Sequence, residues 1–239
     1  AMTYEYGRYH ENALGEYNYN FMQPENVEIP VDTFFANFNW GKSEVDYSIS
    51  TAKWINRNPY DVLAGLELQK GGSYKTNVDW NAILDEHGKL RLSLGLYAPD
   101  TITGLGKTGE GYHTHEDLFW TGFQGDPTKG KPADQSWYGM SNLVVDKTPI
   151  TSADFNTSFN TGHGKHWFVD GKISKEGEWN YRSVSGYLPT WRWWVEHSED
   201  STPLKGRYDF DQAYNGGNSL TFEGDLKANS SQNVMLYST

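Results

Sequence analysis

The feature that most constrains the fold is a two-faced alternation that recurs in four short segments of the chain. Each segment places apolar side chains at every second position, which is the periodicity of a β-strand. The opposite face of each segment becomes polar toward its C-terminal end. The segments are residues 34–40 (FFANFNW), 62–69 (VLAGLELQ), 90–97 (LRLSLGLY) and 155–160 (FNTSFN).

The connections between these segments indicate parallel strands joined by helices. After the first segment, apolar residues recur at helical spacing from Val45 to Ala52, and Asn58-Pro59 ends the pattern. A second, short helix is predicted over residues 78–86 (VDWNAILDE). A strand, a helix and a strand at this spacing predict parallel crossover units.

The single apolar face distinguishes between two kinds of parallel sheet. An open, doubly wound sheet buries both of its faces, so its strands read as continuous apolar runs. In a closed barrel, helices cover the outer face and polar groups are accepted near the top of the lumen. We therefore expect an α/β fold of the (β/α)8 TIM-barrel type, with its site at the C-terminal ends of the strands.

Polar strand ends and nearby aromatic residues are the candidate substrate-binding groups. We interpret the stretch FNTSFNTGHGKHWFVDG (155–171) as a strand end that meets a cleft. The alternative is a tight turn with an incidental histidine. For Glu67 the alternative role is a structural partner of Arg91 or of a neighbouring asparagine. The candidates are Asn39, Trp40, Glu67, Gln69, Tyr97, Trp120, Asn160 and His163, with the two tryptophans as stacking platforms.

The connection over residues 98–154 is long enough to predict a lid or a binding surface. It carries Trp120, Phe123, Trp137 and Tyr138 beside Asp, Gln and Gly residues, a composition typical of a sugar subsite. His113-Thr114-His115 could bind a metal ion, but no third ligand stands at a recognisable spacing. We therefore interpret these histidines as solvated loop residues and expect neither a metal nor a cofactor.

The sequence pattern changes after residue 196, from strands joined by helices to short strands joined by turns. Residues 189–196 (PTWRWWVE) end the region assigned to the barrel, and a polar linker follows. The remaining segment has short strand patterns separated by Asn-Gly-Gly and Asp/Ser turns, and AYNGGNSL resembles the opening of a jelly-roll β-sandwich. Roughly forty residues cannot bury enough surface to fold alone. We therefore predict a barrel domain over residues 1–196 and the start of a β-sandwich domain over residues 197–239.

Composition excludes several classes of partner. The formal net charge is -11 and no run of Lys and Arg occurs, so nucleic acid is a poor candidate. No apolar run approaches about 18 residues, so we expect no membrane insertion. The chain has no Cys, which is compatible with either redox compartment. Ala1-Met2-Thr3 lacks the basic and apolar regions of a signal peptide.

Taken together, six motifs resemble the family 85 glycoside hydrolases, most closely their streptococcal D-type members. In chain order they are FFANFNW, RNPYDVLAGLELQ, LRLSLGLYAPDT, SFNTGHGKHWFVDGK, EWNYRSVSGYLPTWRWW and AYNGGNSL. The resemblance implies a (β/α)8 barrel followed by β-sandwich domains. It also implies an endo-β-N-acetylglucosaminidase that cleaves between the two core N-acetylglucosamines of N-linked glycans, on a free glycan or a glycoprotein.

The mechanism implied by the resemblance is substrate-assisted hydrolysis with retention. The oxygen of the 2-acetamido group attacks the anomeric carbon, a Glu serves as general acid and then base, and an Asn two residues before it orients the acetamide. Such hydrolases need no metal and depart from the two-carboxylate scheme.

One part of the family pattern is not matched. The only Asn-x-Glu in the chain is Asn26-Val27-Glu28, which lies between Pro24 and Pro30 just ahead of a strand, at the bottom of the barrel. We reject it as the catalytic pair and expect that pair upstream, so the chain is predicted to be the second half of the barrel, strands 5–8. Its expected partners are the N-terminal half and the glycan, in an extracellular, secreted or cell-wall-anchored protein. The alternatives are a non-catalytic N-glycan-binding module and a purely structural fragment.

Overall fold

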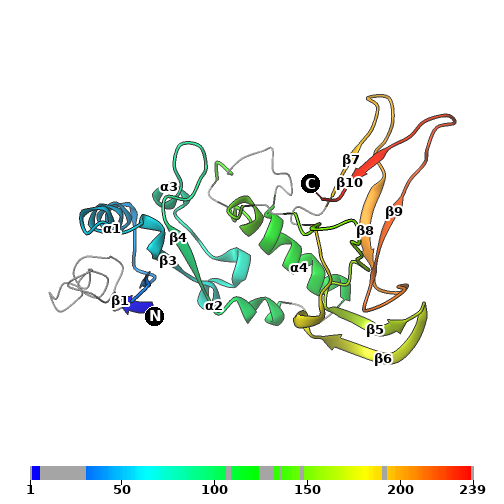
Figure 1. Ribbon diagram of the computed structural model, residues 1–239, viewed down its shortest axis with the longest axis horizontal. Coiled ribbons are helices and arrows are strands. Elements are labelled where there is room, and N and C mark those ends of the chain that lie inside the picture. Colours follow the sequence, from blue (N-terminus) through cyan, green and yellow to red (C-terminus); the bar gives the residue numbers. More distant parts are fainter. Residues whose placement is uncertain are drawn as a thin grey trace. The chain divides into compact units, whose positions relative to one another are not determined.

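The computed structural model describes most of the chain, and its contacts fall into two compact units (Figure 1). The first unit comprises Ala1–Ile102 and Gly122–Leu143, and the second comprises Thr103–Thr121 and Val144–Thr239. Among the described residues, no helix has both the length and the apolar character needed to cross a membrane. The described residues are 2–5, 31–105, 109–123, 132–134, 136–145, 148–189 and 193–237, without the side chains of 2–5 and 194.

The first unit is built on a four-stranded sheet in which every neighbouring pair is parallel. The sheet order follows the sequence order: β1 (Met2–Glu5), β2 (Thr33–Ala36), β3 (Val62–Glu67) and β4 (Ser93–Tyr97). Three of the four predicted strands are thereby confirmed, with shorter bounds, and β1 was not predicted. Sequential parallel strands are the order found along a barrel wall.

Helix α1 (Lys42–Trp54) confirms the predicted crossover helix between β2 and β3. The backbone N–H of Gly41 donates to Oε2 of Glu44 at 2.9 Å, which satisfies one of the free donors at the helix start. The buried stripe of the helix faces the sheet, and Ala52 joins Phe34 and Val62 in one core cluster. The helix ends before Asn58-Pro59, and a 3-10 turn over Pro59–Asp61, which was not predicted, follows.

The predicted second helix is a single turn, α3 (Trp80–Ile83), whose start is capped by Asp79. Trp80 is fully buried, and its Nε1 donates to the carbonyl oxygen of Ser136 at 3.0 Å. Its ring packs edge-on against Trp137 and tilted against Tyr138. Those two rings are therefore core residues of the first unit, which contradicts their predicted place in an open sugar subsite.

The connection predicted over residues 98–154 contains regular structure. Helix α4 (Gly109–Thr121) occupies its middle, with 3-10 turns at Pro99–Gly104 and Met140–Asn142. The buried side of α4 includes Tyr112, Glu116 and Phe119, which are spaced at helical intervals. The helical spacing was not recognised in the sequence because Asp, Gly and His residues lie among these buried positions.

The second unit is dominated by antiparallel pairs. Strands β5 (His163–Val169) and β6 (Lys172–Asn180) form a hairpin, and Asp170 and Gly171 at its turn both have positive φ, of 49° and 73°. The other pairs are β7 (Trp194–Glu196) with β10 (Asn233–Met235), and β8 (Lys205–Asp209) with β9 (Ser219–Glu223).

Residues 155–160 form no strand, so the fourth strand prediction is wrong. The hydroxyl of Thr157 accepts a hydrogen bond from the Phe159 amide at 3.1 Å and donates to the Tyr187 carbonyl at 2.9 Å. Phe159 has φ of 54°, which is incompatible with a continuing strand. Local side chain to backbone bonds therefore replace the strand ladder in this segment.

The Asn- and Gly-rich segment 160–164 packs against the motif AYNGGNSL (213–220). Oδ1 of Asn218 accepts from the backbone N–H of Thr161 at 2.8 Å, and its Nδ2 donates to the Phe159 carbonyl at 2.8 Å. A Cβ on Gly217 would collide with the His163 carbonyl and lie 2.7 Å from the Trp179 ring, so this close approach requires glycine. The predicted boundary at residue 196 does not coincide with a division between the two units, because residues on both sides of it belong to the second. The two predicted domains stay a prediction.

Candidate functional site

The carboxyl ends of strands β3 and β4 bring two of the predicted residues together in the first unit. Glu67 and Tyr97 are register partners at the last positions of these parallel strands. Asn39 and Trp40 lie in the short connection between the end of β2 and the start of α1. This edge of a parallel sheet is where ligand sites of α/β folds are built.

Trp40 is held at this edge by a hydrogen bond and is not freely placed. Its Nε1 donates to the carbonyl oxygen of Gly65 on β3 at 2.8 Å, and the side chain is half-buried. Tyr97 is 47% exposed, and the Phe38 ring lies 5.3 Å from its ring, centroid to centroid. Two aromatic groups are therefore presented with fixed orientation, and Asn39 beside them is exposed.

Glu67 is the most unusual group at this edge. Its Oε1 is buried and has no hydrogen-bond partner among the described residues. Arg91 is not its partner, because the Arg91 guanidinium contacts Oδ1 of Asp46 at 2.5 Å and the Ala82 carbonyl at 2.8 Å. The proposed structural pairing of Glu67 with Arg91 is therefore wrong. A buried carboxylate oxygen without a donor is costly to keep, and a ligand hydroxyl or amide would satisfy it.

Gln69 does not belong to this group of strand-end residues. The strand ends at Glu67, and Gln69 lies in the single-turn helix α2 (Leu68–Gly71) with an exposed side chain. Alternation along the sequence predicted it to share the face of Glu67, but the change from strand to helix at Leu68 ends that alternation. Its substrate-binding role stays a prediction without geometric support.

The remaining predicted residues, Trp120, Asn160 and His163, belong to the second unit. Trp120 is 44% exposed near the end of α4, where its ring meets Phe119 edge-on. Asn160 is buried: its Nδ2 donates to the Val184 carbonyl at 2.8 Å, and its Oδ1 accepts from the backbone N–H groups of Gly162 and Gly217. That amide is committed to the chain's own backbone, so the arrangement does not favour a substrate contact.

His163 is fully buried at the start of β5, in a cluster that sequence reasoning missed. Its ring meets Tyr112 edge-on at 4.8 Å and stacks on Phe210 at 5.1 Å, centroid to centroid. Nε2 of His163 lies 3.4 Å from Oε2 of Glu116, and Oε1 of Glu116 lies 3.1 Å from Nη2 of Arg182. Burial, followed by the negative charge of Glu116, raises the pKa of the Tyr112 hydroxyl.

Among the described residues, one group could hold a metal ion. The donor atoms of His113, Glu116 and His163 all lie within 4.8 Å of one another. The sequence analysis interpreted His113 and His115 as solvated loop residues, which is wrong, because both lie in α4 and are half-buried. His115 is not in this group. The carboxylate three residues after His113 and a histidine from a distant strand complete it.

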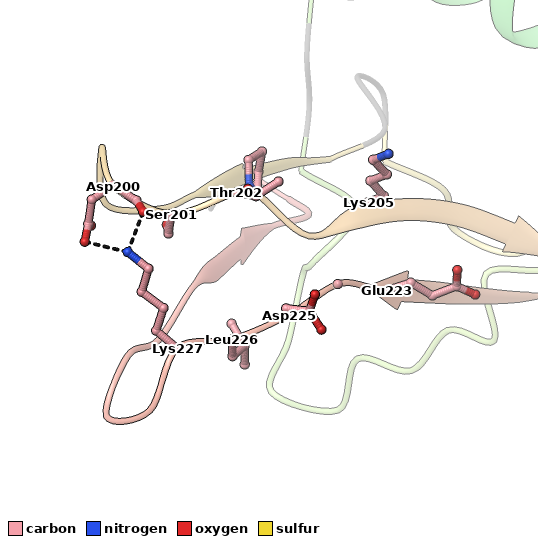
Figure 2. A pocket seen from close by; sticks show the side chains of 10 residues that line it. Asp200, Ser201, Thr202, Lys205, Glu223, Asp225, Leu226 and Lys227 are labelled. Carbon is pink, nitrogen blue, oxygen red and sulfur yellow. Dashed lines mark hydrogen bonds and ion pairs between the residues drawn. The ribbon is translucent and has the colours of Figure 1, made fainter.

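The larger of the described cavities, about 480 Å³, is an open groove in the second unit (Figure 2). Segments 200–205 and 223–227 line it, and no predicted site residue does. Lys227 bonds Asp200 across it at 2.7 Å, and Glu223 pairs with Arg207 at 2.8 Å. Lys227, Asp200 and Glu223 are thus engaged by the chain's own side chains, and no observation at this groove points to a ligand.

Comparison with known proteins matches the chain to a family model and to named relatives. The sequence model of Glycosyl hydrolase family 85 matches residues 1–167. A cytosolic endo-beta-N-acetylglucosaminidase of Danio rerio is 26% identical over 198 residues, which cover 81% of this chain and 24% of that protein. Cytosolic endo-beta-N-acetylglucosaminidase 1 of Arabidopsis thaliana is 24% identical over 211 residues, covering 86% of this chain and 27% of that protein.

A solved structure matches the chain with higher sequence identity than these two relatives do. The crystal structure of the glycoside hydrolase domain of Endo-D from Streptococcus pneumoniae is 64% identical and superposes with a TM-score of 0.84. The match covers 99% of this chain and 38% of that chain. The chain spans about a quarter of the length of the curated relatives it matches.

Proposed function

Because the chain belongs to glycosyl hydrolase family 85, as its six motifs predict, we propose that it supplies substrate-binding parts of an endo-β-N-acetylglucosaminidase. The substrate would be the GlcNAc-β1,4-GlcNAc core of N-linked glycans. The relatives from Danio rerio and Arabidopsis thaliana carry the name of this activity, and the matched streptococcal structure is a glycoside hydrolase domain. The parallel order of β1–β4 supports a place in the wall of a (β/α)8 barrel.

The observation that carries the proposal is the buried Oε1 of Glu67 at the end of a parallel strand, which has no hydrogen-bond partner within the described part of the chain. Sugar hydroxyls and the N–H of an acetamido group are donors that would complete its hydrogen bonding. Tyr97, its register partner, offers an exposed ring to the apolar face of a pyranose. A few polar groups beside aromatic walls are the usual composition of such a site.

For the chemical step we propose the substrate-assisted, retaining route that the family resemblance implies. The oxygen of the 2-acetamido group would attack the anomeric carbon, and an Asn/Glu pair would orient that group and move the proton. Glu67 and Tyr97 would bind and orient the sugar in this scheme. We propose that the Asn/Glu pair lies on the family segment that precedes this one. Asn26-Val27-Glu28, already rejected as that pair, lies outside the described residues.

A location outside the cell stays a prediction. The relatives from Danio rerio and Arabidopsis thaliana are named as cytosolic proteins, which describes those proteins. The prediction of a secreted or cell-wall-anchored protein therefore draws no support from them.

Release of glycans from a high-mannose glycoprotein tests the proposal. The purified 239-residue chain should release none, and mixing it with a polypeptide that carries the preceding half of a family 85 barrel should restore release. Hydrolysis by the chain alone would show that the catalytic pair is misplaced. Tight calorimetric binding of a chitobiose-core glycan by the chain alone, without restored release in the mixture, would favour the glycan-binding module.

A further inference from the structure

The second unit contains a buried cluster that the proposed hydrolysis does not use. His113 and Glu116 stand three residues apart on α4, so their side chains share one face of the helix. His163, the first residue of β5, meets that face. We propose that these three side chains form a binding site for a zinc-like divalent cation, built from other residues than the proposed glycan-binding residues Glu67 and Tyr97.

The donor geometry is close to what such an ion needs. Two ligands of a tetrahedral Zn²⁺ with bonds of about 2.0–2.1 Å stand roughly 3.3 Å apart. Nε2 of His163 and Oε2 of Glu116 are 3.4 Å apart, which already fits this spacing. All three donors lie within 4.8 Å of one another, so side-chain adjustment is needed to bring the whole set to tetrahedral spacing. Three protein ligands leave a fourth position for water.

The state of His163 is the independent observation that points to a ligand. The side chain has no exposed surface, and neither ring nitrogen has a hydrogen-bond partner among the described residues. A neutral imidazole carries one donor and one acceptor, and buried ones are normally satisfied. Tyr112 and Phe210 cover the ring and offer it aromatic faces. A cation on Nε2 would satisfy the acceptor nitrogen in this enclosed position.

Arg182 would hold the ligating carboxylate of Glu116 in position without contacting the ion. Its Nη2 lies 3.1 Å from Oε1 of Glu116, which leaves Oε2 turned toward His163. Hydrogen bonding of a ligating carboxylate from outside is common at metal centres and fixes its orientation. The rival arrangement is a metal-free network in which Glu116 is shared between Arg182 and a protonated His163. The experiment below separates the two.

The donor types select the class of ion, and a cavity offers it a route. Two imidazoles and one carboxylate suit Zn²⁺ and its neighbours, whereas Ca²⁺ and Mg²⁺ prefer all-oxygen sets. A cavity of about 190 Å³ is lined by His113, Trp193 and Arg207 among others, so the cluster adjoins an opening. A bound ion would join α4 to β5 and stabilise the second unit by mass action.

Titration with Co²⁺ tests the site through a signal other than activity. The chain, free of any histidine tag, is dialysed against a chelator and titrated while its visible d–d absorption is recorded. We expect one Co²⁺ per chain in low-coordinate geometry, displaced by Zn²⁺. Glu116→Gln and His163→Asn should each weaken binding by about tenfold or more. His115→Ala, on the same helix but outside the trio, should bind as the wild type does.

Two controls keep the result decisive. Near-ultraviolet circular dichroism shows whether each variant keeps its fold, and His113→Gln, at a half-buried position, replaces His163→Asn if the latter unfolds. Absence of Co²⁺ binding by the folded wild type would overturn the proposal and favour the metal-free network. Binding that Glu116→Gln and His113→Gln leave unchanged would overturn it as well, because the ion would then sit elsewhere.

Discussion

Removing the Asn218 side chain should destabilise the second unit more than any exposed substitution. Asn218 is fully buried, and its amide makes three hydrogen bonds of 2.8–2.9 Å, two from Thr161 and one to the Phe159 carbonyl. Each bond contributes about 1 kcal/mol net, and partners left unsatisfied in the interior add to the loss. We therefore expect Asn218→Ala to lower the free energy of unfolding by about 3–4 kcal/mol.

Urea denaturation followed by tryptophan fluorescence measures this loss. The matched control is Asn215→Ala in the same motif, where one exposed amide oxygen accepts a single bond from the Asp170 amide at 3.1 Å. That variant should lose only about 0.5–1 kcal/mol. Asn218→Asp keeps the two acceptor contacts but buries a charge and loses the donor, so it should not recover stability. If Asn218→Ala and Asn215→Ala lose the same free energy of unfolding, the contacts of Asn218 with Phe159 and Thr161 do not stabilise this unit as we propose.

Two further substitutions test the first unit. Gly95→Ala places a methyl group into the Phe35 ring and should cost about 1–3 kcal/mol of unfolding free energy in the same urea assay. The control Gly104→Ala, in the second unit and with nothing within 4 Å of the added methyl group, should cost little. Equal losses would contradict the close approach of Gly95 to Phe35. Hydrogen bonds from Lys42, and then from Arg91, lower the pKa of Asp46 below its usual 3.8. These interactions therefore stabilise the fold above pH 3.8, and their contribution is lost as the pH falls through the lowered pKa of Asp46. Because the Asp46 side chain is 42% exposed, Asp46→Asn should cost only about 0.5–1 kcal/mol at pH 7. The cost should decrease as the pH falls below 3.8, and a loss that does not depend on pH would refute the ion-pair explanation.

The parts of the fold that the sequence predicted correctly are those where local periodicity and tertiary packing agree. The alternation of β3 and the apolar spacing of α1 both place their buried side chains in one core, so each pattern survives folding. Residues 155–160 alternate equally well, but there the Thr157 hydroxyl binds the backbone and Phe159 adopts a positive φ. Alternation alone does not distinguish a strand from a segment whose backbone is satisfied by side chains.

The candidate site divides in the same way. The positions of Glu67 and Tyr97 at strand ends could be predicted because strand ends are a property of the local pattern, and their register follows from parallel pairing, whereas their substrate-binding role stays a prediction. The cluster of His163, Glu116 and Arg182 could not be predicted. It joins Glu116 to two residues far along the chain, and the helix that carries Glu116 was not recognised because its sequence contains glycines and charged residues. The substrate-binding role of Asn160 stays a prediction, and its amide oxygen accepts a hydrogen bond from the backbone N–H of Gly217, a contact between residues 57 positions apart that local pattern does not indicate.

The most direct test of the central claim is the steady-state rate of glycan release when Glu67 is altered. The measurement uses a fusion of this chain to the N-terminal half of a family 85 barrel, the arrangement that the proposal requires for activity. Glu67→Gln should lower kcat/KM by about tenfold or more with unchanged stability, because a charged hydrogen bond to the sugar is lost. Glu86→Gln, at a side chain that is 86% exposed, should leave kcat/KM unchanged. Equal activity in the two variants would contradict a substrate-binding role for this edge of the sheet.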